Sequence, residues 1–248
     1  MFDGTPATKK LCKQMCKSSK GEVILMFSLG KDSTAMWQFL IECGFTKIHP
    51  IYCEVIPGLK CVQRSLRYYE KKFDTKIHRY LMNEGLPQIG DMVFQPAQDQ
   101  VAIEELGLWT YRISDVAEMF RQEHDIHDRV WSAEGILQAD ALVRRTYINK
   151  YGPKIKDYQV FYPIYDWKPN DLLDFLKGRN IKLSEEYQYS NRTFCGPPKA
   201  DALERLKQVR PEDFEAFKLW YPLIEANMAR NIFRRRHLGH SEAVELGV

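Results

Sequence analysis

The chain has 248 residues, of which 44% are apolar and 28% charged, an ordinary composition for a globular protein with a sizeable core. Its net charge of +3 is too small to indicate nucleic-acid binding by itself, and no apolar stretch is long enough to cross a bilayer. The N-terminus has no hydrophobic signal core, so the sequence predicts a cytoplasmic protein without a membrane partner.

The first predicted elements follow an N-terminal extension at residues 1–20. The apolar run Val23 to Phe27 predicts a buried strand, and a short turn then leads into a helix. Gly30 is expected to supply backbone angles that other residues avoid, and Asp32 or Ser33 is expected to cap the helix. The arrangement predicted is strand, turn and helix, with Lys31 at the junction.

This turn carries the groups that bind phosphate. Unpaired N–H groups of the helix, the hydroxyls of Ser28 and Ser33 and the Lys31 ammonium would face one anion, favoured by the helix dipole. A Walker loop is excluded because Leu25 stands where that motif needs glycine, and a dinucleotide fingerprint needs three spaced glycines. The alternative is a plain strand-to-helix turn with a capping aspartate and a solvated lysine.

The next elements continue an alternation of helix and strand. A helix ending near Gly44, a strand over 48–55 and a helix over 62–73 predict parallel strands with right-handed crossovers. Ligands of such sheets lie beyond the carboxyl ends of the strands, and Glu54 ends the second strand beside that crevice, where an exposed strand-end glutamate is an equal alternative to a site residue. The more polar pattern of residues 98–128 predicts a helical insertion.

A second candidate for anion binding begins at the strand Val130 to Ala133. Gly135 follows that strand, and Arg144 and Arg145 are expected on a helix that starts there. Their guanidinium groups would then reach the same crevice as Lys31 and hold an anion bidentately. The alternative is an amphipathic helix whose arginines are solvated.

The rest of the chain holds a last main strand, a loop and a helical tail. The strand is predicted over 160–167, and Cys195 lies in a turn-rich loop over 189–198. Residues 201–248 are expected to form a helical extension in which the run Arg234 to Arg236 is a hint of nucleic-acid binding. A solvated helix face explains that run as well.

Three motifs resemble one family over roughly residues 20–200. The segment Ser28 to Ser33, Ser-x-Gly-Lys-Asp-Ser, resembles the PP-loop of the ATP pyrophosphatase superfamily, in the branch of phosphoadenylylsulfate (PAPS) reductases and the small subunit of sulfate adenylyltransferase. Most members carry glycine where this chain has Leu29. A second motif matches partly at Gly135 and Arg144, and a third matches well between Pro163 and Trp167. The resemblance implies an α/β fold, a doubly wound, mostly parallel Rossmann-like sheet over residues 21–200.

The resemblance also implies an activity. Family members cleave a nucleotide at its α-phosphate, so we expect ATP and Mg²⁺ as ligands, Asp32 as a ligand of that Mg²⁺, and transfer of the adenylyl group to an unidentified acceptor in sulfur metabolism or nucleic-acid thio-modification. The expected catalytic residues are Lys31, Arg144 and Cys195. The residues expected to bind the nucleotide are Ser28, Leu29, Gly30, Lys31, Asp32, Ser33, Glu54, Gly135 and Arg145.

Two other functions stay open. A sulfonucleotide reductase needs a reactive cysteine near the end of the chain, and none follows Cys195. An iron-sulfur cluster is not expected, because Cys195 has no paired cysteine in its loop. A non-enzymatic module that binds nucleotide or nucleic acid is the third alternative. The sequence does not determine the oligomeric state, so a homo-oligomer stays among the alternatives.

Overall fold

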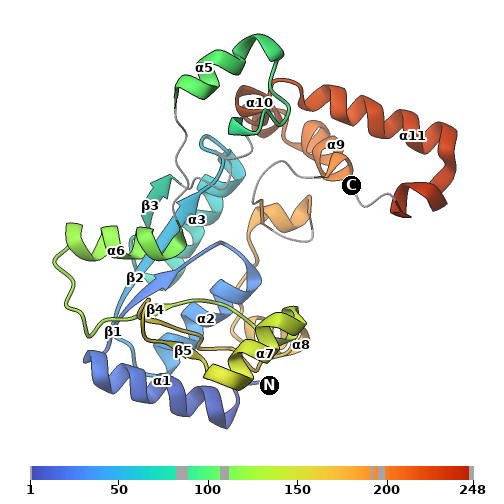
Figure 1. Ribbon diagram of the computed structural model, residues 1–248. Coiled ribbons are helices and arrows are strands. Elements are labelled where there is room, and N and C mark those ends of the chain that lie inside the picture. Colours follow the sequence, from blue (N-terminus) through green and yellow to red (C-terminus); the bar gives the residue numbers. More distant parts are fainter. Residues whose placement is uncertain (1, 82–88, 107–111, 191–192, 195–198, 246–248) are drawn as a thin grey trace. The chain divides into compact units, whose positions relative to one another are not determined.

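The computed structural model describes residues 2–81, 89–106, 112–190, 193–194 and 199–245 of the chain. It divides into two compact units (Figure 1). Unit 1 comprises Met1–Cys53, Ser65–Tyr80 and Tyr111–Ser184, and unit 2 comprises Glu54–Arg64, Leu81–Thr110 and Glu185–Val248. No helix in the described ranges combines the length and the apolar character that a membrane crossing requires.

A six-stranded sheet forms the centre of the fold, with the strand order β3-β2-β1-β4-β6-β5. The neighbours β2, β1, β4 and β6 pair in parallel, and β5 pairs with β6 in the antiparallel sense. The predicted α/β class with a mostly parallel sheet is confirmed. The strands are β1 (Glu22–Met26), β2 (Lys47–Glu54), β3 (His78–Leu81), β4 (Ser132–Ala133), β5 (Lys154–Ile155) and β6 (Val160–Phe161).

Helices connect the strands and make up most of unit 2. Those between and beside the strands are α1 (Pro6–Ser19), α2 (Lys31–Glu42), α3 (Lys60–Phe73), α6 (Ile113–Glu123), η2 (Gln138–Asp140, 3-10), α7 (Leu142–Tyr151) and α8 (Pro169–Gly178). The others are η1 (Ala97–Asp99), α5 (Gln100–Glu105), η3 (Glu185–Gln188), α9 (Ala200–Val209), α10 (Pro211–Trp220) and α11 (Ile224–Glu245). The expected helical segments at 98–128 and 201–248 therefore contain helices.

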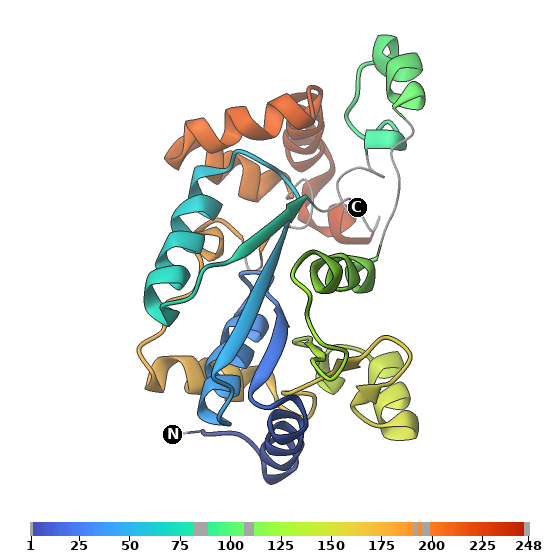
Figure 2. The same cartoon turned by 90° about the vertical axis from the view of Figure 1, so that its left-hand side faces the viewer.

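Helices cover both faces of the sheet (Figure 2). On one face, Phe120 of α6 packs in a buried cluster with Ile24 of β1. On the other, Phe27 makes edge contacts with Trp37 of α2 and Tyr69 of α3, at ring-centroid distances of 5.0 and 5.2 Å. Because both faces are covered, the short central strands can be apolar without alternation.

The order of the strands places a topological switch point between β1 and β4. From β1 the chain proceeds outward through β2 to β3, and it then returns to the other side of β1 to form β4. The connection after β1 therefore leads to one side of β1, and the connection after β3 leads to its other side. In open α/β sheets a crevice forms outside the carboxyl ends of the strands at such a point, and ligands bind there.

The last parallel strand is shorter than the sequence predicts. The pattern indicates a strand over 160–167, whereas β6 contains only Val160 and Phe161. Tyr162 N–H still donates to Pro153 O at 2.9 Å, but the following residue is Pro163, which has no N–H to continue the ladder. The apolar residues beyond β6 instead fold back as turns, and Ile164 and Trp167 are buried there.

The N-terminal segment packs into unit 1. Thr5 caps α1, because its Oγ1 accepts from Thr8 N–H at 3.2 Å, and the same hydroxyl donates to Asp166 Oδ2 at 2.7 Å. Leu11 and Met15 are buried on the inner side of the helix. One side of α1 is therefore held in the core while the other remains exposed.

In unit 2 a fully buried carboxylate holds the start of α3. Asp213 of α10 accepts hydrogen bonds from the backbone N–H groups of Lys60 and Cys61, the latter at 3.2 Å. Arg64 lies 3.9 Å from the same carboxylate and is bound in a bidentate pair by Glu185. The first N–H groups of a helix have no partner within the helix, so Asp213 supplies one.

A pH-dependent contribution to stability is expected from Glu22. Its carboxylate on β1 pairs with Lys47 at 2.8 Å and with His49 at 2.9 Å, both on β2. Burial acts to raise the pKa of Glu22, but the hydrogen bonds from Lys47 and His49 outweigh burial and hold the pKa below its ordinary value of 4.5. The stabilisation is therefore present above pH 4.5 and is lost as the pH falls through the lower folded-state value.

Glu22→Gln should accordingly lower the free energy of unfolding by about 1 kcal/mol at neutral pH and by progressively less below pH 4.5. Urea titrations across that pH range measure the difference between variant and wild type. Glu105→Gln, at an exposed position of α5, serves as the control and should match wild type. A Glu22→Gln deficit that stays constant down to acid pH would refute the assigned ion pairs.

Candidate nucleotide-binding site

Hydrogen bonds of the Ser33 hydroxyl close the turn between β1 and α2. Gly30 is the N-cap residue, and no side chain caps the helix. The Ser33 hydroxyl donates to Gly30 O at 3.1 Å and accepts from Ser28 N–H at 3.2 Å, with Ser28 Oγ 3.1 Å away. The prediction that Asp32 or Ser33 caps the helix is wrong, because the helix begins at Lys31 and both residues lie within its first turn.

The unusual backbone angle of the turn belongs to Leu29 and not to Gly30. Gly30 has an ordinary extended conformation (φ −70°, ψ 156°), whereas Leu29 has a φ of +60°. The prediction that Gly30 supplies the special angles is therefore wrong. The Leu29 side chain is fully buried, and its burial offsets the cost of a left-handed conformation.

The positive φ of Leu29 reverses the usual order of stability of an alanine variant and a glycine variant at this position. Leu29→Ala removes buried apolar atoms and should lower the free energy of unfolding by about 2–4 kcal/mol. Glycine ordinarily costs about 0.5–1 kcal/mol more than alanine, but at a positive φ it relieves strain of about 1 kcal/mol or more. Leu29→Gly should therefore be at least as stable as Leu29→Ala in urea denaturation. If Leu29→Gly is the less stable of the two, the left-handed turn is not present.

An ion pair stands at the start of α2. Lys31 Nζ lies 2.9 and 3.1 Å from the two carboxylate oxygens of Asp32, and each side chain is between a quarter and a third exposed. Burial raises the pKa of the Asp32 carboxyl, the charge of Asp140 acts in the same direction, and Lys31 opposes both. The ammonium is thus positioned at the turn and is accessible enough to exchange its carboxylate for another anion.

Gly135 lies directly against the start of α2. A Cβ at this position would stand 3.2 Å from Ser33 N and 3.3 Å from the carbonyl carbon of Asp32, both of them backbone atoms. β4 brings Gly135 there, because Ala133 pairs with Leu25 of β1. The structure therefore brings together the two segments that the sequence singled out separately, and it does so at the switch point of the sheet.

The arginines of the second segment lie later on a helix than expected. A helix starting at Gly135 is not formed: η2 spans Gln138–Asp140 and α7 begins only at Leu142. Arg144 pairs with Asp140 at 2.7 Å with about half of its side chain exposed, and Arg145 is exposed. Since Asp140 acts on the pKa of Asp32, the Arg144–Asp140 pair lies in the electrostatic neighbourhood of the turn.

Two further polar side chains lie at the same edge of the sheet. Glu134 follows β4 and Tyr162 follows β6, and the strands pair so that Ala133 is opposite Phe161. Burial raises the pKa of Glu134. The pKa of Tyr162 is raised to about 12, by burial first and then by Glu134. Neither residue stands out in the sequence, although both directly follow strands, because their proximity appears only when the two strands are known to be neighbours.

Glu54 and Cys195 are the two remaining predicted site residues. Glu54 is the last residue of β2, and its side chain is partly buried. Cys195 lies outside the described residues, so its predicted roles stay predictions. None of the five described cysteines forms a disulfide; they are Cys12, Cys16, Cys43, Cys53 and Cys61.

Asp32 is the carboxylate that could take part in holding Mg²⁺. Within the described ranges no group of three or more His, Cys, Asp or Glu side chains forms a metal cage. Mg²⁺ does not need one, since it commonly binds one or two carboxylates together with substrate phosphates and water. A partly buried aspartate at the start of α2, beside the candidate turn, fits that mode of binding.

Comparison with known proteins gives a limited result. No protein-family model and no curated protein matches the chain. Among solved structures, the NH3-dependent NAD synthetase of Campylobacter jejuni is 10% identical with a TM-score of 0.45, over 92% of this chain and 93% of that one. The U34-tRNA thiolase NcsA of Methanococcus maripaludis is 13% identical with a TM-score of 0.45, over 88% and 80%. Likenesses this weak assign no reaction, so the function has to be argued from the residues of this chain.

Proposed function

We propose that this protein binds ATP at the turn Ser28–Ser33 and cleaves it at the α-phosphate, transferring the adenylyl group to an acceptor and releasing pyrophosphate. The observation that carries the proposal is the close approach of Gly135 to the first turn of α2. Because Gly135 has no side chain, its backbone lies against the backbone of Asp32 and Ser33, directly after Lys31 in the chain. The PP-loop resemblance of the turn and its place at the switch point of the sheet support the same proposal.

The chemistry follows from the charges at the turn. An acceptor oxygen, nitrogen or sulfur atom attacks the α-phosphorus, and the bond from that phosphorus to the oxygen of the β-phosphate breaks. Negative charge then develops on the departing pyrophosphate, where the N–H groups of α2 and the Lys31 ammonium stabilise it. When bound, Mg²⁺ supplies further positive charge between the phosphates, with Asp32 as its protein ligand.

Three neighbouring side chains are suited to binding the acceptor and taking its proton. Arg144 carries a guanidinium group that can leave Asp140 for a phosphate or for an anionic acceptor. Glu134 is a partly buried carboxyl group with a raised pKa, which suits it to take the proton of the acceptor, and Tyr162 stands beside it. The proposal assigns the acceptor to sulfur metabolism or nucleic-acid thio-modification on the family resemblance.

The experiment that tests the proposal measures binding of radiolabelled ATP by equilibrium dialysis and needs no acceptor. Wild type should bind ATP in the presence of Mg²⁺. Gly135→Ala forces the first turn of α2 to yield by a few tenths of an ångström and should weaken binding about tenfold, equivalent to about 1.4 kcal/mol. Gly135→Val places two further methyl groups there and should abolish measurable binding.

Gly90→Ala is the matched control, because a Cβ at Gly90 meets nothing within 4 Å. It should bind ATP as wild type does, and circular dichroism should show all variants folded. Absence of ATP binding by wild type, or unchanged binding by Gly135→Val, would overturn the assignment. Binding of a sulfonucleotide in preference to ATP, with sulfite released in the presence of thioredoxin and lost in Cys195→Ser, would favour the reductase alternative.

A further inference from the structure

One segment near the start of this protein carries only positive charge. Five of the 36 basic residues and none of the 33 acidic residues lie between Thr5 and Lys20. The rest of the chain therefore carries a slight excess of negative charge, although the whole has a net charge of +3. A field of one sign over a single short segment attracts a partner of the opposite sign.

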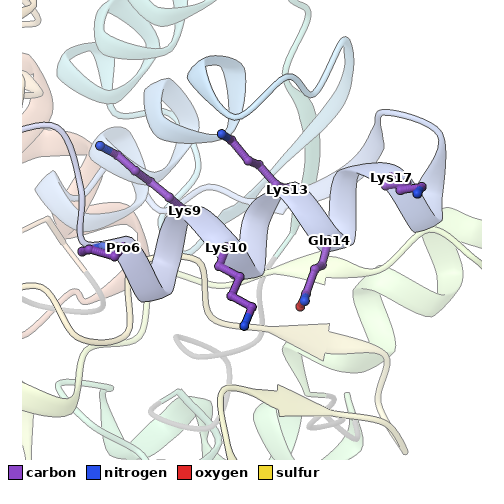
Figure 3. A pocket seen from close by; sticks show the side chains of 6 residues that line it. All are labelled: Pro6, Lys9, Lys10, Lys13, Gln14 and Lys17. Carbon is purple, nitrogen blue, oxygen red and sulfur yellow. The ribbon is translucent and has the colours of Figure 1, made fainter.

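The structure places these lysines on the exposed side of α1. Lys10, Lys13 and Lys17 are exposed, while Leu11 and Met15 are buried on the other side. Figure 3 shows the lysine side chains projecting from the helix. A shallow hollow along this face is lined by Pro6, Lys9, Lys10, Lys13, Gln14 and Lys17, which we call the α1 lysine face.

Most of this charge is not neutralised by the protein itself. Lys9 pairs with Asp3 at 2.7 Å. In the part of the chain that the structure describes, Lys10, Lys13 and Lys17 have no carboxylate within ion-pair distance. Three lysines whose charge is balanced only by solvent ions release those ions when an extended anion replaces them.

The chemistry of the face distinguishes between the large anions that could bind it. Insertion of an amphipathic helix into an anionic membrane needs an apolar side next to the lysines, and in α1 that side is buried in unit 1. Single-stranded nucleic acid is held largely by aromatic stacking, and the segment 6–20 contains no aromatic residue. Lysines act as point charges toward phosphate and need no particular base, which fits the sequence-independent part of duplex binding.

We propose that the α1 lysine face binds the phosphate backbone of a nucleic-acid duplex without reading its sequence. Lys10, Lys13 and Lys17 contact phosphates directly, and Lys9 contributes once Asp3 gives way. The inference is independent of the proposed ATP chemistry, since it concerns a different surface and requires no bound nucleotide. It also differs from the predicted role of Arg234 to Arg236 at the other end of the chain.

Fluorescence anisotropy with labelled duplexes of about 20 base pairs, one of DNA and one of RNA with the same sequence, measures this binding between about 50 and 200 mM salt. Wild type should bind at least one of the two duplexes, with an affinity that falls as salt rises. The triple variant Lys10→Gln, Lys13→Gln and Lys17→Gln should lose at least tenfold in affinity at low salt. The slope of log affinity against log salt should become shallower by about 2 to 3, as expected for three lost phosphate contacts.

The matched control is Lys71→Gln, Lys72→Gln and Lys76→Gln, which removes the same charge from three exposed lysines elsewhere in unit 1. It should stay within about twofold of wild type. The proposal is overturned if wild type binds neither duplex, or if the control variant loses as much affinity as the triple variant at Lys10, Lys13 and Lys17. It is also overturned if neutralising Arg234 to Arg236 abolishes binding while the triple variant at Lys10, Lys13 and Lys17 still binds. Lysine-dependent binding to phosphatidylserine vesicles in the absence of duplex binding would also overturn it, in favour of a membrane.

Discussion

Lys31→Met is expected to lower the rate of pyrophosphate release from ATP by about 100-fold or more, the loss that follows removal of one preorganised charge at a developing anion. The ammonium of Lys31 stands at the start of α2 with Asp32 as its present partner. In the proposed reaction it moves to the phosphates, so its removal raises the energy of the transition state more than that of bound ATP. The measurement is release of labelled pyrophosphate with water as the acceptor.

Two variants separate this role from a loss of folding. Lys31→Arg keeps the charge but changes the geometry and should retain part of the rate. Lys71→Met, at an exposed position of α3, should match wild type. The Lys31 and Asp32 side chains are both partly exposed, so Lys31→Met should unfold at nearly the wild-type urea concentration. A folded Lys31→Met protein with the full rate would exclude the lysine from the reaction.

Asp213→Ala should lower the free energy of unfolding by about 3–5 kcal/mol, the largest stability effect expected in this chain. The fully buried carboxylate accepts from the backbone N–H groups of Lys60 and Cys61. Alanine leaves both donors buried without a partner and leaves a space where the carboxylate was. Urea denaturation followed by circular dichroism measures the change.

Asp213→Asn tests the cause of that loss. Its amide oxygen can still accept from one N–H group, so it should cost less than Asp213→Ala. Glu215→Ala, two residues further along α10, removes an exposed carboxylate and should change stability by less than about 0.5 kcal/mol. If Asp213→Ala were as mild as Glu215→Ala, the carboxylate would not be needed at the start of α3.

The fold class could be predicted from the sequence because it depends on local patterns. Apolar runs such as Val23 to Phe27, each followed by a helical pattern, indicate buried parallel strands whatever their neighbours are. The strand, turn and helix around Ser28–Ser33 could be predicted in the same way, since the three are continuous in the chain. Element ends were less well predicted: β6 stops before Pro163, and α7 begins seven residues after Gly135.

The candidate site is only partly a local feature. That Lys31 stands at a strand-to-helix turn follows from the sequence, whereas the approach of Gly135 to Ser33 depends on β4 pairing beside β1. Glu134 and Tyr162 likewise meet only because β6 lies next to β4. Neither pairing can be predicted from a short segment, because any two apolar strands can pair. Their order in the sheet depends on how the helices pack on its two faces.

By itself, therefore, the sequence determined which segments become strands and helices, that an ammonium group would stand at one turn, and that the five lysines between Thr5 and Lys20 have no acidic residue among them. Only the tertiary structure decided that Leu29 and not Gly30 takes the left-handed conformation, because the burial of its side chain outweighs the strain. It also decided which side of α1 is covered, since Leu11 and Met15 must pack on unit 1 and thereby leave Lys10, Lys13 and Lys17 exposed.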